Sequence, residues 1–492
     1  MPSPEFLELT PAGRPAGATA PRPLPPPRRG VRQRLDGVVR PFACVLVVVV
    51  LVQLPRSLED DARAALLAFG VAVVLWSTTR LPAAWVALAC AVGLVALGGA
   101  EQEDLFAALA ADVVWLMVGA FVLGGAIRAT GLAGRLTAVL GRRVRTVGGA
   151  TWAVTAMLVP LSLLIPSTSG RAAVMLPVHR ALTRALDDRA VTRALSLLVP
   201  VVVLVSTICT LVGAGSHLIA VDLLDDATGE SISFARWLVW GVPFGVAASA
   251  ISCWVIGRLF LTADLRRTPL SLPPAERRPL DGAEQRTLLV TAVMVALWST
   301  ESVHGLEVAF VALAGAVVLT APGVGVLPWK EGVAAVSWNL VVFVGAALVL
   351  GEALVDTGAA AWLVERLFTF SGIGRTESVL LVLVVLALLT LTSHLYMTSH
   401  AARAAALVPA VLSLAASLDL DPVAVVFIGT VGMDYCLTLA VSSKALLLYS
   451  ELEEETFEPA DLMRLSAVLL PVHVVLIVVF YLGWWQWTGM AL

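Results

Sequence analysis

Long apolar segments recur from about residue 41 to the C-terminal end of the chain, separated by short polar loops. Hydrophobic residues make up 59% of the 492 residues and charged residues only 14%. A soluble protein of this length could not bury so much apolar surface, so we predict an all-α, polytopic membrane protein. A transmembrane β-barrel would instead show short segments of alternating hydrophobicity, which this sequence lacks.

The apolar segments divide into two halves of similar order. The first half covers 41–262 and follows a tail rich in Pro and Arg at 1–40, which we expect to be disordered and cytoplasmic. A hydrophilic cytoplasmic linker at 263–286 leads to the second half at 287–492. We predict about eleven transmembrane helices plus two re-entrant hairpins. The predicted helices lie at about 41–54, 62–79, 81–99, 112–130, 195–223, 237–261, 287–303, 306–321, 338–357, 422–450 and 465–486. We expect the spans at 195–223 and 422–450 to be interrupted, at 213–217 and near 438–444.

Two similar motifs interrupt apolar runs at corresponding places in the halves. In each, a serine precedes an arginine by four residues, and a proline follows six residues after the arginine. Lipid tolerates such an interruption only where it is buried in protein or lines a cavity, and two matching interruptions indicate a transporter's binding site. We therefore predict hairpin tips at 167–170 and 399–402, although two spans with a tight extramembrane turn are an alternative for the first. The motifs are Ser167-Thr168-Ser169-Gly170-Arg171 and Ser399-His400-Ala401-Ala402-Arg403.

A second match supports an internal repeat. Val122-Leu123-Gly124-Gly125-Ala126 is followed by Thr130-Gly131, and Val349-Leu350-Gly351-Glu352-Ala353 by Thr357-Gly358 at the same spacing. Each match precedes its hairpin motif by about one span. The two halves are therefore predicted to be structural repeats.

The distribution of arginine predicts the orientation. Basic residues cluster in the tail, at 131–147, at 180–193 and in the linker, which places these segments and the N-terminus in the cytoplasm. Acidic loops near 101–104 and 222–230 would then lie outside. With this alternation the second hairpin enters from the opposite side to the first, so the repeats have inverted topology. We expect a multi-pass protein of the plasma (inner) membrane.

At these motifs the chain resembles the divalent anion/sodium symporter family, which carries Ser-Asn-Thr at two hairpin tips. The corresponding triplets here begin at Ser167 and Ser399. The loop at 210–217 is similar to the family's Thr-x-x-Gly-Thr-Pro-Pro-Asn segment, and 439–444 is its counterpart in the second half. The resemblance covers about 60–490. It implies transport of dicarboxylates, citrate or sulfate, an elevator-type movement and a homodimer.

The chain departs from the family at its asparagines. Thr168 and His400 replace those of the tips, and His217 and Lys444 replace those of the loops. The resemblance implies a sodium ion near Ser167, Thr168 and Gly213 as the only candidate cofactor. Because the substituted positions have become basic, we hypothesise that Lys444 takes the place of one sodium ion. The histidines either couple transport to protons or are packing residues.

We predict a secondary active transporter for a small divalent or organic anion, coupled to Na⁺ or H⁺. Helix N-termini, hydroxyls and arginines would bind the anion, although Arg171 and Arg403 could instead pair with structural acids such as Asp434 or Asp112. An uncoupled channel or uniporter, or an anion exchanger, is the alternative. The candidate binding residues are Ser167, Thr168, Ser169, Arg171, Gly213, Ser216, His217, Ser399, His400, Arg403, Ser442, Ser443 and Lys444.

Other functional classes lack their sequence signatures. The chain has no His-rich metal motif, no nucleophile with a base at matching spacing and no phosphate-binding loop, so we do not expect an enzyme. Its five cysteines are scattered through apolar runs, without the spacing of metal ligands. The expected partners are a small anionic solute, the lipid bilayer and a second copy of the chain, and no nucleic acid.

Overall fold

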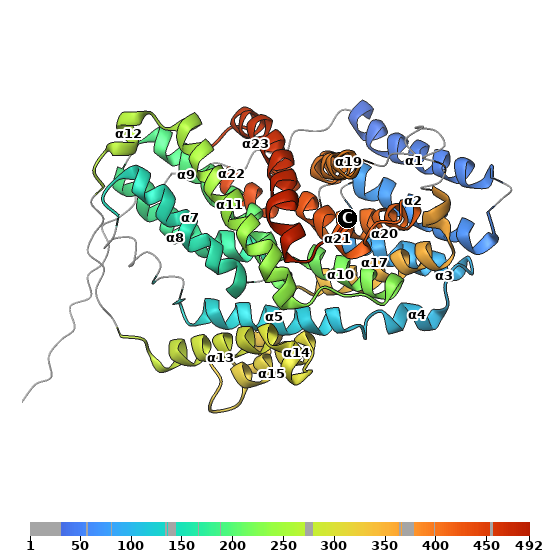
Figure 1. The fold of residues 1–492 in the computed structure, drawn as a ribbon, viewed down its shortest axis with the longest axis horizontal. Coiled ribbons are helices and arrows are strands. Elements are labelled where there is room, and N and C mark those ends of the chain that lie inside the picture. Colours follow the sequence, from blue (N-terminus) through green and yellow to red (C-terminus); the bar gives the residue numbers. More distant parts are fainter. Residues whose placement is uncertain are drawn as a thin grey trace, which may run out of the picture.

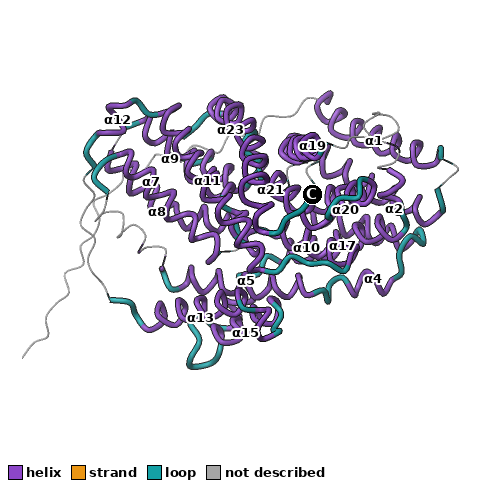
Figure 2. Tube along the Cα trace, viewed as in Figure 1, coloured by secondary structure: helices purple, strands orange, loops and turns teal. Residues whose placement is uncertain are grey.

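The computed structural model of this protein is built of helices. It describes residues 31–55, 58–79, 81–132, 135, 144–165, 167–186, 188–270, 279–363, 366, 378–397, 399–452 and 456–492. Within these ranges there is no β-strand (Figure 2). Seven of the described helices are long and apolar enough to cross a membrane, and shorter apolar helices accompany them. The all-helical class predicted from the sequence is confirmed.

The helices of the first half follow the predicted order. The predicted span at 195–223 is broken, because two short 3₁₀ turns separate α9 from α10. The elements are α1 (Val31–Gln53), α2 (Asp60–Thr78), α3 (Ala83–Ala96), α4 (Gln102–Ala107), α5 (Asp112–Ala129), α7 (Val147–Leu164), α8 (Thr168–Leu186), α9 (Arg189–Val205), η1 (Thr207–Cys209), η2 (Leu211–Gly213), α10 (Gly215–Thr228), α11 (Phe234–Phe260) and α12 (Ala263–Arg267).

The second half repeats this order from α13 onward. Its broken span lies between α21 and α22, with a 3₁₀ turn between them. The elements are α13 (Gly282–Ser299), α14 (Glu301–His304), α15 (Val308–Thr320), α16 (Trp329–Ala334), α17 (Trp338–Asp356), α19 (Val379–Thr392), η3 (Ser393–Leu395), α20 (His400–Ser417), α21 (Pro422–Met433), η4 (Ala440–Ser442), α22 (Lys444–Ser450), α23 (Pro459–Phe480), η5 (Tyr481–Trp485) and η6 (Gln486–Thr488).

Capping residues explain why several helices begin before their apolar run. A capping box of Asp281 and Glu284 starts α13 at Gly282, and one of Glu458 and Asp461 starts α23 at Pro459. Such boxes satisfy free N–H groups of the first turn, so the helix begins at the cap. Hydropathy alone placed these starts several residues later.

The repeated Thr-Gly pairs end equivalent helices in the same way. Thr130 follows α5 and Thr357 follows α17, and each donates its backbone N–H to the carbonyl four residues earlier. Gly131 and Gly358 come next, with φ of 69° and 70°. Glycine adopts this left-handed conformation at no steric cost and commonly ends helices. The match between the two halves therefore includes backbone geometry as well as sequence.

The two halves are interlocked. In Figure 1, α13 and α15 of the second half lie beside α5 of the first, and both pack against it. In the mirrored relationship, α2 and α3 of the first half pack against α17 of the second. The interruptions between α9 and α10 and between α21 and α22 are called the first and second break. The helix after each break packs against the opposite half, α10 against α20 and α22 against α8. This exchange brings the two hairpin motifs and the two breaks into one buried region.

The predicted tail and the predicted linker are only partly covered by the described residues. Residues 1–30 of the predicted tail lie outside the described residues, but α1 begins at Val31, so 31–40 are helical rather than part of a disordered tail. Much of the predicted linker also lies outside the described residues. Its described parts are α12, the segment up to residue 270, and the start of α13 from residue 279.

Candidate functional site

Each predicted hairpin turns at the serine that begins its motif, and that serine caps the returning helix. Ser167 Oγ accepts a hydrogen bond from the Gly170 N–H at 3.1 Å, at the start of α8. Ser399 Oγ accepts one from the Ala402 N–H at 3.3 Å, at the start of α20. Capped helix N-termini carry partial positive charge and free N–H groups. The two motifs therefore supply equivalent anion-attracting helix ends.

The other tip side chains are half-buried. Ser169 Oγ lies 3.1 Å from Ser167 Oγ, and Thr168 is the first residue of α8. On the second tip, His400 Nε2 lies 3.1 Å from the Cys436 Sγ. The His400 Nδ1 atom is buried and has no hydrogen-bond partner among the described residues. The second tip therefore offers a buried ring nitrogen without a partner.

Arg171 is completely buried and connects its hairpin to the break in the same half. Its Nη2 donates to Thr207 Oγ1 at 2.8 Å and lies 3.5 Å from the Gly213 carbonyl. Its Nη1 donates to Ser206 Oγ at 3.3 Å. Ser206 caps the C-terminal end of α9, where the helix dipole favours a cation. Arg171 thereby stabilises the broken span.

Arg403 is equally buried but less fully bonded. Its Nη1 donates to the Tyr435 carbonyl at 3.3 Å, just beyond the C-terminal end of α21. Its Nε and Nη2 are buried and have no hydrogen-bond partner in the part of the chain that the structure describes. A buried guanidinium with unused donors is costly unless something else satisfies them. Arg403 is therefore the better placed of the two arginines to bind an anion.

A histidine and an aspartate join the two breaks across the halves. His217 is in the first turn of α10, and Asp434 caps the C-terminal end of α21. The His217 Nε2 lies 2.6 Å from Asp434 Oδ2, and the two side chains are 0% and 5% exposed. Ser216 Oγ lies 3.5 Å from the other carboxylate oxygen. The indole ring of Trp237 lies 4.8 Å from the imidazole, between ring centroids.

The second break places its candidate residues differently. Ser442 is buried and donates to the Cys436 carbonyl at 2.8 Å, so it stabilises the turn itself. Ser443 caps α22 by accepting from the Ala445 N–H at 3.2 Å. Lys444 is the first residue of α22, and its side chain is exposed. His217 therefore takes part in the buried pair with Asp434 that joins the two halves, whereas Lys444 does not.

Sequence reasoning missed the hydrogen-bond partners that organise this region. The arginines donate to the Ser206 and Thr207 hydroxyls and to the Tyr435 carbonyl. Asp434, which we expected as a structural partner of an arginine, pairs with His217 instead. The available signal was a lone aspartate directly after the apolar run of α21. An acid at that depth is rare in membrane helices and requires a partner.

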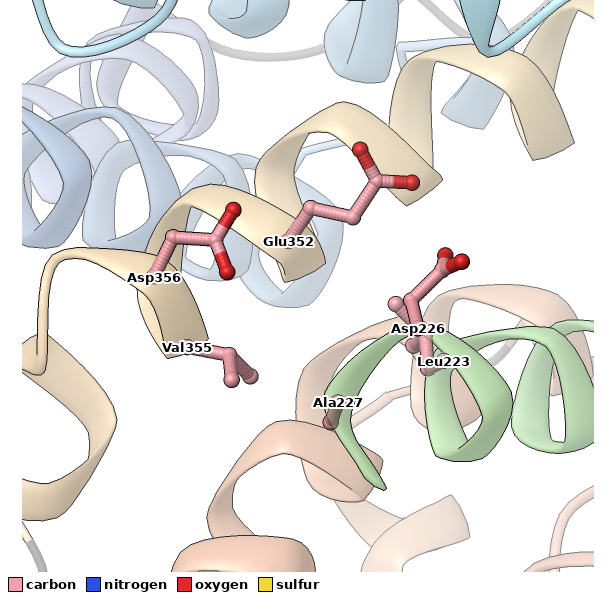
Figure 3. Close-up of a pocket in the computed structure, with 6 residues that line it drawn as sticks. All are labelled: Leu223, Asp226, Ala227, Glu352, Val355 and Asp356. Atoms are coloured by element: carbon pink, nitrogen blue, oxygen red, sulfur yellow. The ribbon is translucent and has the colours of Figure 1, made fainter. Parts of the chain in front are cut away.

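A separate acidic pocket lies at the far end of α10. It has a volume of about 250 Å³ and is lined by Leu223, Asp226, Ala227, Glu352, Val355 and Asp356. Figure 3 shows the carboxylate of Asp226 on α10 facing that of Glu352 on α17. Asp226 is roughly 14 Å along α10 from His217, at a rise of about 1.5 Å per residue. Its carboxylates would repel an anion, so this pocket is not the candidate anion site.

Comparison with known proteins identifies the family. Residues 37–491 match the family described as the sodium:sulfate symporter transmembrane region. This match spans both hairpin motifs and both breaks. It confirms the resemblance that the tip triplets and the loop at 210–217 indicated.

Curated relatives cover most of the chain. A membrane protein of Cupriavidus necator is 26% identical over 91% of this chain and 92% of its own length. A sodium-dependent dicarboxylate transporter of Staphylococcus saprophyticus is 22% identical over 77% of this chain and 78% of its own. A citrate/succinate antiporter of Escherichia coli is 22% identical over 77% and 79%. The last two are transporters rather than enzymes.

A solved structure shares the fold. The Alcanivorax borkumensis YdaH transporter, described as having an unusual topology, aligns with a TM-score of 0.57 at 15% identity. The alignment covers 86% of this chain and 98% of that one. At this identity the likeness concerns the fold. Together with the family match over nearly the full length, it shows that the chain belongs to the sodium:sulfate symporter family of integral membrane transporters.

Proposed function

We propose that this protein is a secondary active transporter of small divalent or organic anions of the dicarboxylate, citrate or sulfate class, coupled to Na⁺ or H⁺. The observation that supports this most directly is Arg403, a completely buried guanidinium whose Nε and Nη2 have no partner among the described residues. It is in the first turn of α20, directly after a capped helix N-terminus. An anion there would satisfy both the orphan donors and the helix end.

The proposed anion site combines groups of different kinds. Arg403 provides charge and the forked donor geometry that suits carboxylate or sulfate oxygens. His400, with its unused Nδ1, lies on the same tip. The hydroxyls of Thr168 and Ser169 on the first tip are half-buried and would supply neutral donors. Arg171 is occupied by the first break and would contribute to the site through its charge.

We also propose how the protein moves its cargo. The hairpins and broken spans would move as one body against the interlocked helices α2–α5 and α13–α17, in an elevator-type movement. The direct bonds from each hairpin arginine to the break in its own half support such a body. We further propose a homodimer in the plasma (inner) membrane with a cytoplasmic N-terminus, which the basic segments at 180–193 and 264–267 favour.

Anion exchange is the second candidate function. Relatives named as a citrate/succinate antiporter and as an L-tartrate/succinate antiporter support it. An exchanger would carry labelled substrate inward only against internal substrate. A coupled symporter would accumulate it against its gradient without internal substrate.

Transport by the purified protein tests these proposals. Proteoliposomes would be given labelled succinate, citrate or sulfate under separately imposed Na⁺ and proton gradients, with and without internal unlabelled anion. We expect saturable uptake of at least one anion, at least 10-fold reduced in Arg403→Gln, since a charged hydrogen bond contributes about 1.5–3 kcal/mol. Arg258→Gln is the matched control, because this guanidinium stacks on Trp254 at 5.3 Å, outside the proposed site. Absence of uptake of every anion in all conditions would contradict the proposed function.

A further inference from the structure

The contact between His217 and Asp434 requires a proton. The His217 Nδ1 lies 3.0 Å from the Thr210 carbonyl. A carbonyl oxygen only accepts hydrogen bonds, so Nδ1 carries a hydrogen. If Nε2 had none, its lone pair would face an ionised carboxylate oxygen at 2.6 Å, which is repulsive. The short contact is therefore attractive only when a further proton lies between Nε2 and Oδ2, on either atom.

We propose that the His217–Asp434 pair is the binding site for a coupling proton, placed where the two halves of the transporter meet. This inference rests on the proposed transport function and specifies its coupling ion. His217 belongs to α10 in the first half and Asp434 to the end of α21 in the second, so the proton holds the two breaks together. Removal of the proton leaves a buried negative charge and weakens that contact.

The surroundings of the pair are mainly cationic or neutral. Arg171 interacts electrostatically with Asp434. Cys436 is beside Asp434, and Trp237 covers the imidazole face. Asp226 of α10 and Glu352 and Asp356 of α17 lie at the far end of α10. The elements around the pair carry these titratable or charged groups: Arg171 (α8), Cys209 (η1), Asp222 (α10), Asp112 (α5), Glu352 and Asp356 (α17), His394 (η3), His400 and Arg403 (α20), Tyr435 and Cys436 (after α21) and Lys444 (α22). Asp222 interacts with Asp112 and with Asp226 at the far end of α10.

Charge then links the proton to a divalent anion. The buried arginines Arg171 and Arg403 contribute two positive charges, and the protonated pair contributes none. The imidazoles of His394 and His400 contact only neutral partners among the described residues, so we count them as neutral. Loss of the shared proton lowers this buried net charge from +2 to +1. In a low-dielectric interior, a doubly negative anion therefore binds better to the protonated state, and by linkage it promotes proton uptake.

A sodium ion fits this region less well. The resemblance placed Na⁺ near Ser167, Thr168 and Gly213. The Gly213 carbonyl lies 3.5 Å from Nη2 of Arg171, so a guanidinium already faces the expected ligand. Ser167 Oγ is engaged with Gly170 and Ser169. Arg171 would repel a second cation beside it. A proton on the His217–Asp434 pair only neutralises that pair, so it meets no such repulsion.

The test separates proton coupling from the choice of substrate. Proteoliposomes with labelled succinate would be compared under an inward proton gradient, under an inward Na⁺ gradient and in exchange against internal succinate. Asp434→Asn is the informative variant, because its amide can donate to Nε2 and mimics the protonated pair. We expect the wild type to accumulate succinate with the proton gradient alone. In Asp434→Asn this accumulation should be reduced at least 10-fold, while exchange against internal succinate should persist. The proposal would be overturned if the proton gradient drove accumulation in Asp434→Asn as it does in the wild type. It would also be overturned if the Na⁺ gradient alone drove accumulation in the wild type.

A second readout does not depend on the substrate. Trp237 lies against the imidazole, so its fluorescence, obtained as the difference between the wild type and Trp237→Phe, reports the state of the pair. We expect a pH-dependent change of this fluorescence in the wild type that is absent in Asp434→Asn and in His217→Asn. If exchange of succinate also fails in the wild type, the substrate assignment is wrong while this titration still tests the proton site. No pH-dependent Trp237 signal in the wild type contradicts the proton site itself.

His400 provides the internal comparison. It is a second histidine of the region, half-buried, and has no carboxylate partner in the described structure. His400→Gln can change the affinity for succinate, but we expect the ratio of uptake with and without the proton gradient to persist. Loss of this ratio in His400→Gln together with its retention in Asp434→Asn would move the proton site to His400 and overturn the assignment.

Discussion

Arg171 and Arg403 occupy equivalent positions, four residues after a capping serine, yet only Arg171 has hydroxyl partners for both of its terminal nitrogens. Ser206 and Thr207 receive the Arg171 guanidinium, whereas Arg403 reaches one backbone carbonyl. Both side chains are 0% exposed. The two arginines therefore have the same charge and the same burial, but different hydrogen-bond partners. This difference separates a structural role from a binding role.

The first prediction compares these arginines. Arg171→Gln should reduce the free energy of unfolding by about 1–3 kcal/mol, because it removes charged hydrogen bonds in the interior. Arg403→Gln should leave stability unchanged or higher, because it removes a buried charge with unused donors. Thermal unfolding in detergent, followed by circular dichroism, measures both. Equal loss of stability in the two variants would show that both arginines are structural.

The second prediction concerns the capping serines. Ser399→Ala should destabilise the protein by about 1 kcal/mol, whereas Ser399→Gly should cost only a few tenths of that, as is usual for N-caps. Ser167→Ala should behave in the same way. Ser417→Ala is the control, because its exposed hydroxyl merely donates to a carbonyl of its own helix, that of Leu414. A similar effect of Ser417→Ala and Ser399→Ala would argue against a capping role.

The third prediction addresses Lys444, which we expected to replace a sodium ion. Its exposed side chain is at the N-terminus of α22, where the helix dipole disfavours a cation. Lys444→Asn should therefore not lower stability, and an increase of about 0.3–1 kcal/mol is expected at low ionic strength. The Lys hypothesis further requires that the variant alters the cation dependence of uptake. Unchanged ion dependence would contradict it, and the same liposome assay measures this.

Much of the architecture could be predicted from the sequence because its signals are local. Apolar run length gave most helices, and the Ser-x-x-x-Arg motifs gave both turns, since a serine cap acts within one helical turn. The Thr-Gly matches mark the ends of α5 and α17, which have the same backbone geometry. Helix starts such as those of α13 and α23 were placed late, because caps rather than hydropathy determine them.

The contacts between the halves could not be predicted in the same way. The pairing of His217 with Asp434 joins residues more than two hundred positions apart, and no local pattern specifies it. The different partners of Arg171 and Arg403 likewise depend on which hydroxyls follow each broken helix. The repeated motif predicted where Arg171 and Arg403 lie, but tertiary packing decides whether the hydrogen-bond donors of each find partners.

The fourth prediction concerns the close approach of α11 to the first break. A Cβ atom on Gly241 would lie 2.1 Å from the Ile208 carbonyl oxygen, and Trp237 donates to this same oxygen at 2.9 Å. Because the obstacle is backbone, it cannot move aside as a flexible side chain would. Gly241→Ala should therefore push α11 away from η1 and destabilise the protein by about 1–3 kcal/mol, as overpacking does.

A matched glycine makes this prediction specific. Gly93 is also inside a helix, α3, but a Cβ atom there would meet nothing within 4 Å. Gly93→Ala should stabilise the protein by about 0.5–1 kcal/mol through helix propensity. Thermal unfolding of both variants gives the comparison. Because Trp237 also covers His217, Gly241→Ala should in addition change the pH-dependent Trp237 fluorescence, whereas Gly93→Ala should not. Destabilisation of equal size in the two variants would mean that the close approach of α11 to Ile208 does not matter for folding.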